Sequence, residues 1–158
     1  MAHRFHPSLL REYDMRGIVG KTMGVEDAYA LGRSFGTIVR RKGGSSVAVG
    51  YDGRLSSPML ESAVVDGLAD SGIDALRIGL GPTPMLYYAE ATLDVDGGIQ
   101  ITGSHNPADH NGFKLVLAHE AFFGADITKV GAIAAAAIGN RAGAAAPPST
   151  SWTTMSPA

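Results

Sequence analysis

Cysteine is absent from this sequence of 158 residues. Disulfide bonds, thiolate metal ligands and cysteine nucleophiles are therefore excluded. An excess of charge of either sign is also lacking, because the formal net charge is -2 at pH 7. This balance argues against nucleic acid or an anionic membrane surface as the main partner.

Long apolar segments are lacking as well. The longest apolar run near the C-terminus, from Ala132 to Ile138, is far too short to span a bilayer. The N-terminal segment Met-Ala-His-Arg-Phe-His does not contain the apolar core of a signal peptide. We therefore expect a soluble cytoplasmic protein that contacts no membrane.

Helical and strand patterns alternate along the chain. Apolar residues recur at helical spacing from Val25 to Arg40. Similar reasoning predicts further helices from Pro58 to about Ser71 (with Ser56 and Ser57 as its cap), from Pro82 to Ala91, and from about Ala125 onward. Short apolar runs predict strands at Ser46–Tyr51, Asp74–Leu80, Gly97–Thr102 and Phe113–Ala118. The alternation predicts an α/β fold, with a mixed, mostly parallel sheet flanked by helices on both faces.

A polar loop from Gly103 to Gly112 contains the densest cluster of reactive side chains. It follows a predicted strand, and ligands of such sheets bind beyond the carboxyl ends of the strands. Ser104 supplies a hydroxyl nucleophile that needs a neighbouring base or cation, and His105 and Lys114 are candidates for that role. In the alternative reading, Ser104 and Asn106 only close the loop through side-chain hydrogen bonds.

Charged residues outside this loop have two possible roles. Arg16 and Arg54 are candidates to neutralise phosphate oxygens. Alternatively, Arg16 forms an ion pair with Asp14, and Arg54 organises its own turn. We expect Asp14 and Asp52 to hold arginine or to accept hydrogen bonds from backbone amides.

The motif Thr-Gly-Ser-His-Asn-Pro at Thr102–Pro107 closely resembles the active-site serine loop of the α-D-phosphohexomutases. That family includes phosphomannomutase/phosphoglucomutase and phosphoglucosamine mutase. Further segments resemble its other motifs in the same order: Arg11–Gly17, Val49–Ser56, Gly81–Pro84 and Asn111–Lys114. The resemblance spans residues 5 to 135. It implies the first, serine-bearing domain of such an enzyme.

The resemblance also implies a phosphoryl-transfer mechanism. Ser104 would carry a phosphate and donate it to the free hydroxyl of a hexose 1- or 6-phosphate, and the other phosphate of the resulting bisphosphate would return to Ser104. The serine phosphate would bind Mg²⁺, and glucose 1,6-bisphosphate would act as an activator. Hexose phosphates are the expected substrates, and the full-length protein is expected to be a monomer or a weak dimer.

The same resemblance assigns roles to single residues. The implied catalytic residues are Ser104, His105, Lys114, Arg16 and Tyr13, and the implied phosphate-binding residues are Asn106 and Arg54. His105 and Lys114 would contact the serine and the proton-accepting side of the site, and Tyr13 would line the cleft near the phosphoserine. Alternatively, Tyr13 packs its ring in the interior, as we expect for Tyr87 and Tyr88.

The end of the chain has a different character. We expect the domain to occupy residues 1–139 and residues 140–158 to be disordered, because this tail is rich in Ala, Pro, Ser and Thr without periodicity. A frameshift near residue 140 is one hypothesis for the tail, since the frame starting one base earlier can read VDVMDDYVAR over the end of the chain. A deliberately shortened chain with a foreign tail is the other.

Members of the resembled family are longer, and the Asp-Gly-Asp-Gly-Asp-Arg run of their Mg²⁺ site is absent here. A truncated, non-catalytic domain that binds phosphosugar weakly or not at all is therefore the alternative function. Such a chain would expose apolar residues of its last helix. An independent Ser-His hydrolase is disfavoured, because the sequence lacks a Gly-x-Ser-x-Gly elbow and places no acid by motif to orient His105.

Overall fold

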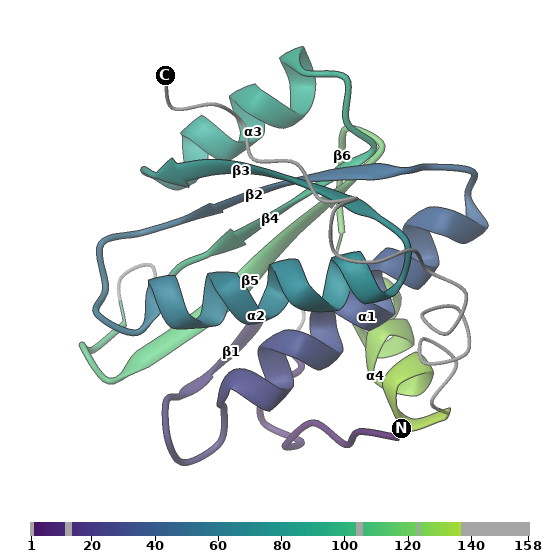
Figure 1. The fold of residues 1–158 in the computed structure, drawn as a ribbon. Helices are drawn as coiled ribbons and strands as arrows, with labels where there is room; N and C mark the ends of the chain where they lie inside the picture. The colour runs from purple at the N-terminus through teal and green to yellow at the C-terminus, as the bar shows by residue number, and fades with distance from the viewer. Residues whose placement is uncertain (1, 12–13, 104–105, 123, 137–158) are drawn as a thin grey trace.

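The computed structural model describes residues 2–11, 14–103, 106–122 and 124–136. Within this part of the chain, the strands form one sheet in the order β1-β5-β4-β2-β3, and β6 pairs with β5 (Figure 1). The strands are β1 (Met15–Ile18), β2 (Ser46–Tyr51), β3 (Asp74–Leu80), β4 (Gly97–Ile101), β5 (His110–Leu117) and β6 (Glu120–Ala121). β2 is parallel to β3 and β4, whereas β5 is antiparallel to β4 and β1. The sheet is therefore mixed, as the sequence predicts.

Helices cover both faces of this sheet. They are α1 (Val25–Arg41), α2 (Ser57–Asp70), α3 (Thr83–Thr92) and α4 (Ala125–Ala136). Figure 1 shows α3 on one face and α1, α2 and α4 on the other. This α/β arrangement confirms the predicted fold class. Among the described residues, no helix is both long enough and apolar enough to cross a membrane.

β2 shows how the sequence builds the two layers. Successive side chains of a strand point to opposite faces of its sheet. Val47 and Val49 belong to the large apolar cluster that includes residues of α1 and α2, whereas Ala48 packs with Leu86 of α3 and with Val95. Because β2 is covered on both faces, it consists almost entirely of apolar residues, as is typical of central parallel strands.

Glycines let α1 and α2 pack at close range. A Cβ added to Gly67 of α2 would overlap the carbonyl oxygen of Tyr29, and a Cβ added to Gly32 of α1 would overlap that of Val64. The two helices therefore contact each other through their backbones as well as their side chains. This contact fixes the position of α2, whose first residue, Ser57, belongs to the polar region described below.

β5 is longer than the sequence predicts. It begins at His110 rather than at Phe113. Its first residues pair with β1, in which Arg16 lies opposite Gly112. The prediction of a loop that continues to residue 112 is therefore wrong. Hydrophobic periodicity does not indicate β1, because so short a strand contains too few residues to show a pattern.

The prediction that Tyr87 and Tyr88 fill the core is also wrong. Tyr87 and Tyr88 are 47% and 72% exposed, and α3 buries Leu86 instead.

In α4, Ile127 and Val130 are buried, because α4 packs against α1. Ala132 and Ala136 are exposed, so the prediction that this helix exposes apolar residues is confirmed only for these alanines. The last described helix thus belongs to the core of this domain.

The predicted domain boundary between residues 139 and 140 lies outside the described residues, and so does the tail. Both assignments stay predictions.

Candidate functional site

The polar region lies where β2 and β4 end. Asp52 follows β2, and Thr102 and Gly103 follow β4. The N–H of Asp52 donates a hydrogen bond to the carbonyl oxygen of Ile101 (2.9 Å), so the two strand ends are joined. Because β2 and β4 are parallel, their carboxyl ends meet at one edge of the sheet, which is where ligands of such sheets bind.

Asp52, Gly53 and Arg54 form what we call the Asp52 turn. The Asp52 carboxylate accepts hydrogen bonds from the N–H of Gly103 (3.0 Å), the N–H of Arg54 (3.1 Å) and the hydroxyl of Ser57 (2.5 Å). Burial by itself raises the pKa of Asp52, but the hydrogen bonds from Ser57, Gly103 and Arg54 together hold this pKa below its ordinary value. Asp52 is therefore an anion that fixes the backbone of Gly103, and the expectation that it accepts backbone amides is confirmed.

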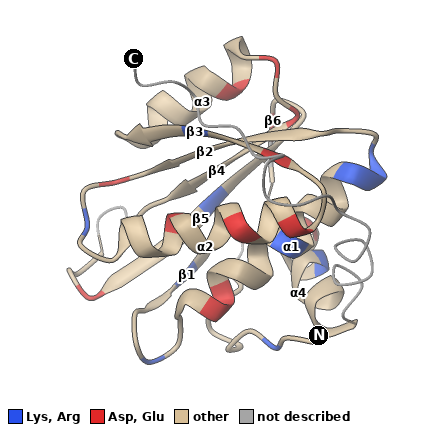
Figure 2. Ribbon diagram, viewed as in Figure 1, with Lys and Arg blue, Asp and Glu red and all other residues tan. Residues whose placement is uncertain are grey.

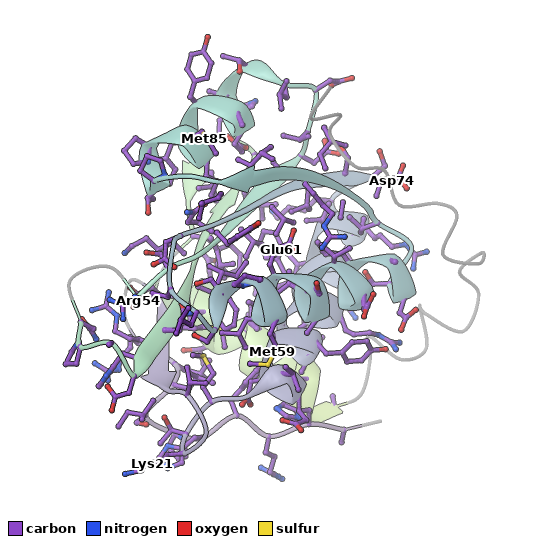
Figure 3. All side chains as sticks on the ribbon, turned by 60° about the vertical axis from the view of Figure 1, so that its left-hand side comes forward. Lys21, Arg54, Met59, Glu61, Asp74 and Met85 are labelled. Carbon is purple, nitrogen blue, oxygen red and sulfur yellow. The ribbon has the colours of Figure 1, made fainter. Side chains whose placement is uncertain are left out.

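Arg54 binds the segment that leads into β5 (Figure 3). Its guanidinium donates hydrogen bonds to the carbonyl oxygens of Asn106 (2.6 Å), Pro107 (2.6 Å) and His110 (3.0 Å). Gly103 leaves the space that this guanidinium fills, because an added Cβ would overlap it. These contacts show that Arg54 organises the chain around it. Its role in binding phosphate stays a prediction.

Asp14, Arg16, Asn106 and Lys114 form a second group, which we call the cation cluster. The Asp14 carboxylate lies 2.6 Å from Nη2 of Arg16 and 3.2 Å from Nζ of Lys114. Nη1 of Arg16 also donates to the side-chain oxygen of Asn106 (2.9 Å). The side chain of Asp14 is 8% exposed, against 24% for Arg16 and 26% for Lys114. A buried carboxylate thus holds two cations that an anion can still reach.

The sheet brings the cation cluster together from distant parts of the sequence. Arg16 stands opposite Gly112 in the antiparallel pairing of β1 with β5. Lys114 stands opposite Gln100 in the antiparallel pairing of β5 with β4. The strand register therefore decides that both cations meet Asp14.

The site carries a small excess of positive charge. Its cations are Arg16, Arg54 and Lys114, and its carboxylates are Asp14 and Asp52, which leaves one formal positive charge. A cavity of about 640 Å³ borders Arg54, Asn106 and Asp109. The Asp109 carboxylate offsets the charge there, so the positive excess lies at the cation cluster. Elsewhere, acidic and basic residues are mixed along the ribbon (Figure 2). The excess suits a site for a small anion rather than for a polyanion.

Four of the residues predicted from the sequence meet at this edge of the sheet: Arg16, Arg54, Asn106 and Lys114. Tyr13, Ser104 and His105 lie outside the described residues. The predicted ion pair between Arg16 and Asp14 is confirmed. The catalytic and phosphate-binding roles of all these residues stay predictions.

Sequence reasoning missed two fully buried polar residues, Ser57 and Asn111. Ser56 is the N-cap of α2, as the sequence predicts, although no side-chain hydrogen bond caps that helix. Ser57 instead donates to Asp52, and Nδ2 of Asn111 donates to the hydroxyls of Ser56 (2.8 Å) and Ser57 (3.0 Å). One signal for this network is Asn111 beside a predicted strand, within the Asn111–Lys114 motif, since a buried amide needs partners.

The described residues contain no group of three or more His, Cys, Asp or Glu side chains that could hold a metal ion. Asp109, which lies within the loop, contacts His110 at 2.8 Å, and the carboxylates of the cation cluster and of the Asp52 turn are also engaged. Asp14 binds Arg16 and Lys114, and Asp52 accepts hydroxyl and amide hydrogen bonds. These residues therefore do not make a Mg²⁺ site by themselves.

The fold and the site define an α/β/α domain whose polar cluster lies at the carboxyl ends of its parallel strands. A family model described as phosphoglucomutase/phosphomannomutase, alpha/beta/alpha domain I, matches residues 7–138. The chain therefore belongs to the phosphoglucomutase/phosphomannomutase family and corresponds to its domain I.

Individual relatives agree with this assignment. The chain is 50% identical over 111 residues to a phosphomannomutase/phosphoglucomutase of Pseudomonas putida, and the alignment covers 70% of this chain and 24% of the relative. It is 45% identical over 125 residues to a phosphoglucomutase of Neisseria gonorrhoeae, with coverage of 79% and 27%. A crystal structure of a family protein from Burkholderia thailandensis superposes with a TM-score of 0.80 at 41% identity, over 87% of this chain and 31% of that one. The chain thus spans only 24% to 27% of the length of these curated relatives.

Proposed function

We propose that this chain is the serine-bearing domain of an enzyme that interconverts hexose 1-phosphates and hexose 6-phosphates. The Ser104 hydroxyl is the proposed carrier of the phosphate. The relatives named phosphomannomutase/phosphoglucomutase and phosphoglucomutase support hexose phosphates as the substrate class.

One observation carries this proposal: the chain is anchored immediately before and after positions 104 and 105. Gly103 donates its N–H to Asp52 (3.0 Å), and the carbonyl oxygen of Asn106 accepts from Arg54 (2.6 Å). The N–H of Asn106 also donates to the carbonyl oxygen of Gly103 (3.0 Å). Phosphoryl transfer depends on positioning and on charge stabilisation more than on activation of the nucleophile. Anchored flanks supply the positioning.

The cation cluster supplies the charge stabilisation in this proposal. Arginine has a forked guanidinium that suits phosphate oxygens, and Lys adds a point charge. Asp14 holds Arg16 and Lys114 in place and offsets part of their charge. A phosphate on Ser104 would then be stabilised without being bound too tightly to leave.

In the proposed half-reaction, the bond between phosphorus and Oγ of Ser104 breaks while the free hydroxyl of the hexose phosphate forms a new bond to phosphorus. The proton of that hydroxyl passes to the side of the site that His105 and Lys114 would line, and Oγ of Ser104 takes up a proton as it leaves. Tyr13 would border the same cleft. Return of the other phosphate of the bisphosphate to Ser104 completes the cycle.

Mg²⁺ is the cofactor that we propose for the whole enzyme, bound through the phosphate on Ser104. Hard cations of this kind need several oxygen ligands, and the described residues do not gather them. We therefore propose that the remaining ligands come from outside this chain.

Phosphate uptake by the purified chain tests the function. The protein is incubated with glucose 1,6-bisphosphate and Mg²⁺, and intact mass and peptide mapping are then recorded. We expect a gain of one phosphate, located on Ser104. Ser104→Ala should gain none, whereas Ser45→Ala, which alters an exposed serine far from the site, should behave like the parent.

Phosphate on another residue, or equal uptake by Ser104→Ala, would overturn the proposed role of Ser104. A folded parent chain that gains no phosphate would favour the alternative function, a non-catalytic domain that requires the rest of the enzyme. Glucose 1-phosphate turnover by the same sample separates uptake from the complete reaction.

A further inference from the structure

A buried polar network connects β5 to the start of the serine loop. Asn111 of β5 donates through Nδ2 to the hydroxyl of Ser57 (3.0 Å). The Ser57 hydroxyl donates to Oδ1 of Asp52 (2.5 Å). Oδ2 of Asp52 accepts the N–H of Gly103 (3.0 Å). Four residues from three separate parts of the chain are thus linked end to end.

The direction of each hydrogen bond in this network is fixed. Oδ1 of Asn111 accepts the N–H of Gly112 (2.9 Å), so the NH₂ group of the amide must face the serines. A serine hydroxyl has a single proton to donate, and Ser57 gives it to the Asp52 carboxylate. The N–H of Gly103 can only donate. The network therefore has one consistent arrangement of donors and acceptors.

Burial makes this arrangement costly to break. Ser57 and Asn111 have no exposed surface, so water cannot reach these two side chains, whereas the side chain of Asp52 is 21% exposed. Loss of one member leaves another buried polar group without its hydrogen bond. The hydrogen bonds also hold the pKa of Asp52 low against the effect of burial, which keeps this carboxylate an acceptor.

We infer that Ser57 and Asn111 are positioning residues, which hold Asp52 so that it fixes the backbone amide of Gly103 at the entrance to the serine loop. The inference deepens the proposed function and rests on it for its catalytic meaning. Neither residue belongs to the cation cluster. Both act through Asp52, one step removed from the residue that would carry the phosphate.

Amide hydrogen exchange of Gly103, measured by NMR on the purified chain, tests the inference directly. The variants are Ser57→Ala and Asn111→Asp, and the second keeps the side-chain shape but replaces the donor with an acceptor. Each should accelerate Gly103 exchange roughly tenfold, because Asp52 is then no longer held against the Gly103 amide. The amide of Asp74, which donates to Ser45 (2.9 Å) and lies on the opposite side of the molecule from Arg54 (Figure 3), should not change.

Two further variants separate positioning from general loosening. Ser62→Ala removes an exposed hydroxyl from the same helix and should leave Gly103 exchange as in the parent. Ser57→Thr restores the hydroxyl and should recover much of the protection. Faster Gly103 exchange in Ser62→Ala, or parent-like exchange in both Ser57→Ala and Asn111→Asp, would overturn the inference.

Phosphorylation kinetics add a second readout. We expect Ser57→Ala to lower the maximal rate of phosphate uptake by Ser104 from glucose 1,6-bisphosphate, with the half-saturating concentration nearly unchanged, because the cation cluster is intact. An unchanged rate with altered exchange would overturn the positioning role. If the parent takes up no phosphate, the proposed function of the isolated chain fails, while Gly103 exchange still decides whether the network holds the loop.

Discussion

The apolar interior beneath α1 and α2 and the polar region at the ends of β2 and β4 are organised in different ways. Close packing stabilises the interior: Phe35 and Leu68 are fully buried, and Gly32 and Gly67 let the backbones of two helices come into contact. Directional interactions stabilise the polar region, since the Asp52 turn and the cation cluster consist of oriented hydrogen bonds and ion pairs.

This difference indicates where stability and chemistry reside. Burial of apolar surface is non-directional and dominates the free energy of folding. Partly exposed ion pairs contribute little to stability, but they place charges with precision. Substitutions in the interior should therefore lower the free energy of unfolding and leave phosphate uptake per folded molecule unchanged. Substitutions in the cation cluster should lower phosphate uptake and leave the free energy of unfolding nearly unchanged.

Phe35→Ala should give the largest effect. Phe35 is fully buried and packs edge-to-face against Phe122 at a centroid distance of 5.3 Å. Its loss removes apolar contacts and leaves a cavity, so we expect the free energy of unfolding to fall by about 3–5 kcal/mol. Urea denaturation measures this change. Tyr88→Ala, at a side chain that is 72% exposed, should change the free energy of unfolding by less than about 0.5 kcal/mol.

Lys114→Met is the opposite case. The side chain keeps its length but loses a charge that contacts Asp14 at 3.2 Å. We expect the rate of phosphate uptake by Ser104 to fall by roughly a hundredfold, a typical cost of removing one stabilising charge. The free energy of unfolding should change by less than about 1 kcal/mol, because Lys114 is partly exposed and Asp14 keeps its ion pair with Arg16. A fall in uptake of the same size in Lys129→Met, at an exposed lysine of α4, would contradict the comparison.

Gly67→Ala tests whether the close approach of α1 and α2 matters. The added Cβ would overlap the carbonyl oxygen of Tyr29, so the helices must separate. We expect a loss of about 1–3 kcal/mol in the free energy of unfolding. Gly53→Ala is the matched substitution, because nothing lies within 4 Å of the added Cβ there. Equal losses in the two variants would show that the helix contact is unimportant.

Asp52→Asn should give the smallest effect and a distinctive pH dependence. Because the folded-state pKa of Asp52 lies below its ordinary value, the carboxylate stabilises the fold above about pH 4, and this contribution disappears as the pH falls through the folded-state pKa. At pH 7 we expect the free energy of unfolding of the parent to exceed that of Asp52→Asn by about 1 kcal/mol. This difference should disappear in acid. Urea denaturation from pH 7 to pH 3 measures it, and a difference that does not depend on pH would contradict this account.

The main strands and helices of the fold follow from local patterns. The predicted strands at Ser46–Tyr51 and Asp74–Leu80 match β2 and β3 residue for residue. The predicted helix from Val25 to Arg40 differs from α1 by a single residue. Such segments are readable because apolar spacing directly reflects which side chains face the core. The exposure of Tyr87 and Tyr88 could not be read in this way, since α3 is short and its pattern is weak.

Local sequence patterns are sufficient to predict the α/β class, the order of the main elements and the polar loop that follows β4, because each depends on neighbouring residues. Folding of the sheet is needed to bring Arg16 and Lys114 to Asp14, and to bring Asn111 to Ser57. Lys114 and Asp14 are 100 residues apart in the chain. Their meeting depends on the register of β1, β4 and β5, and a shift of one residue would turn these side chains to the other face.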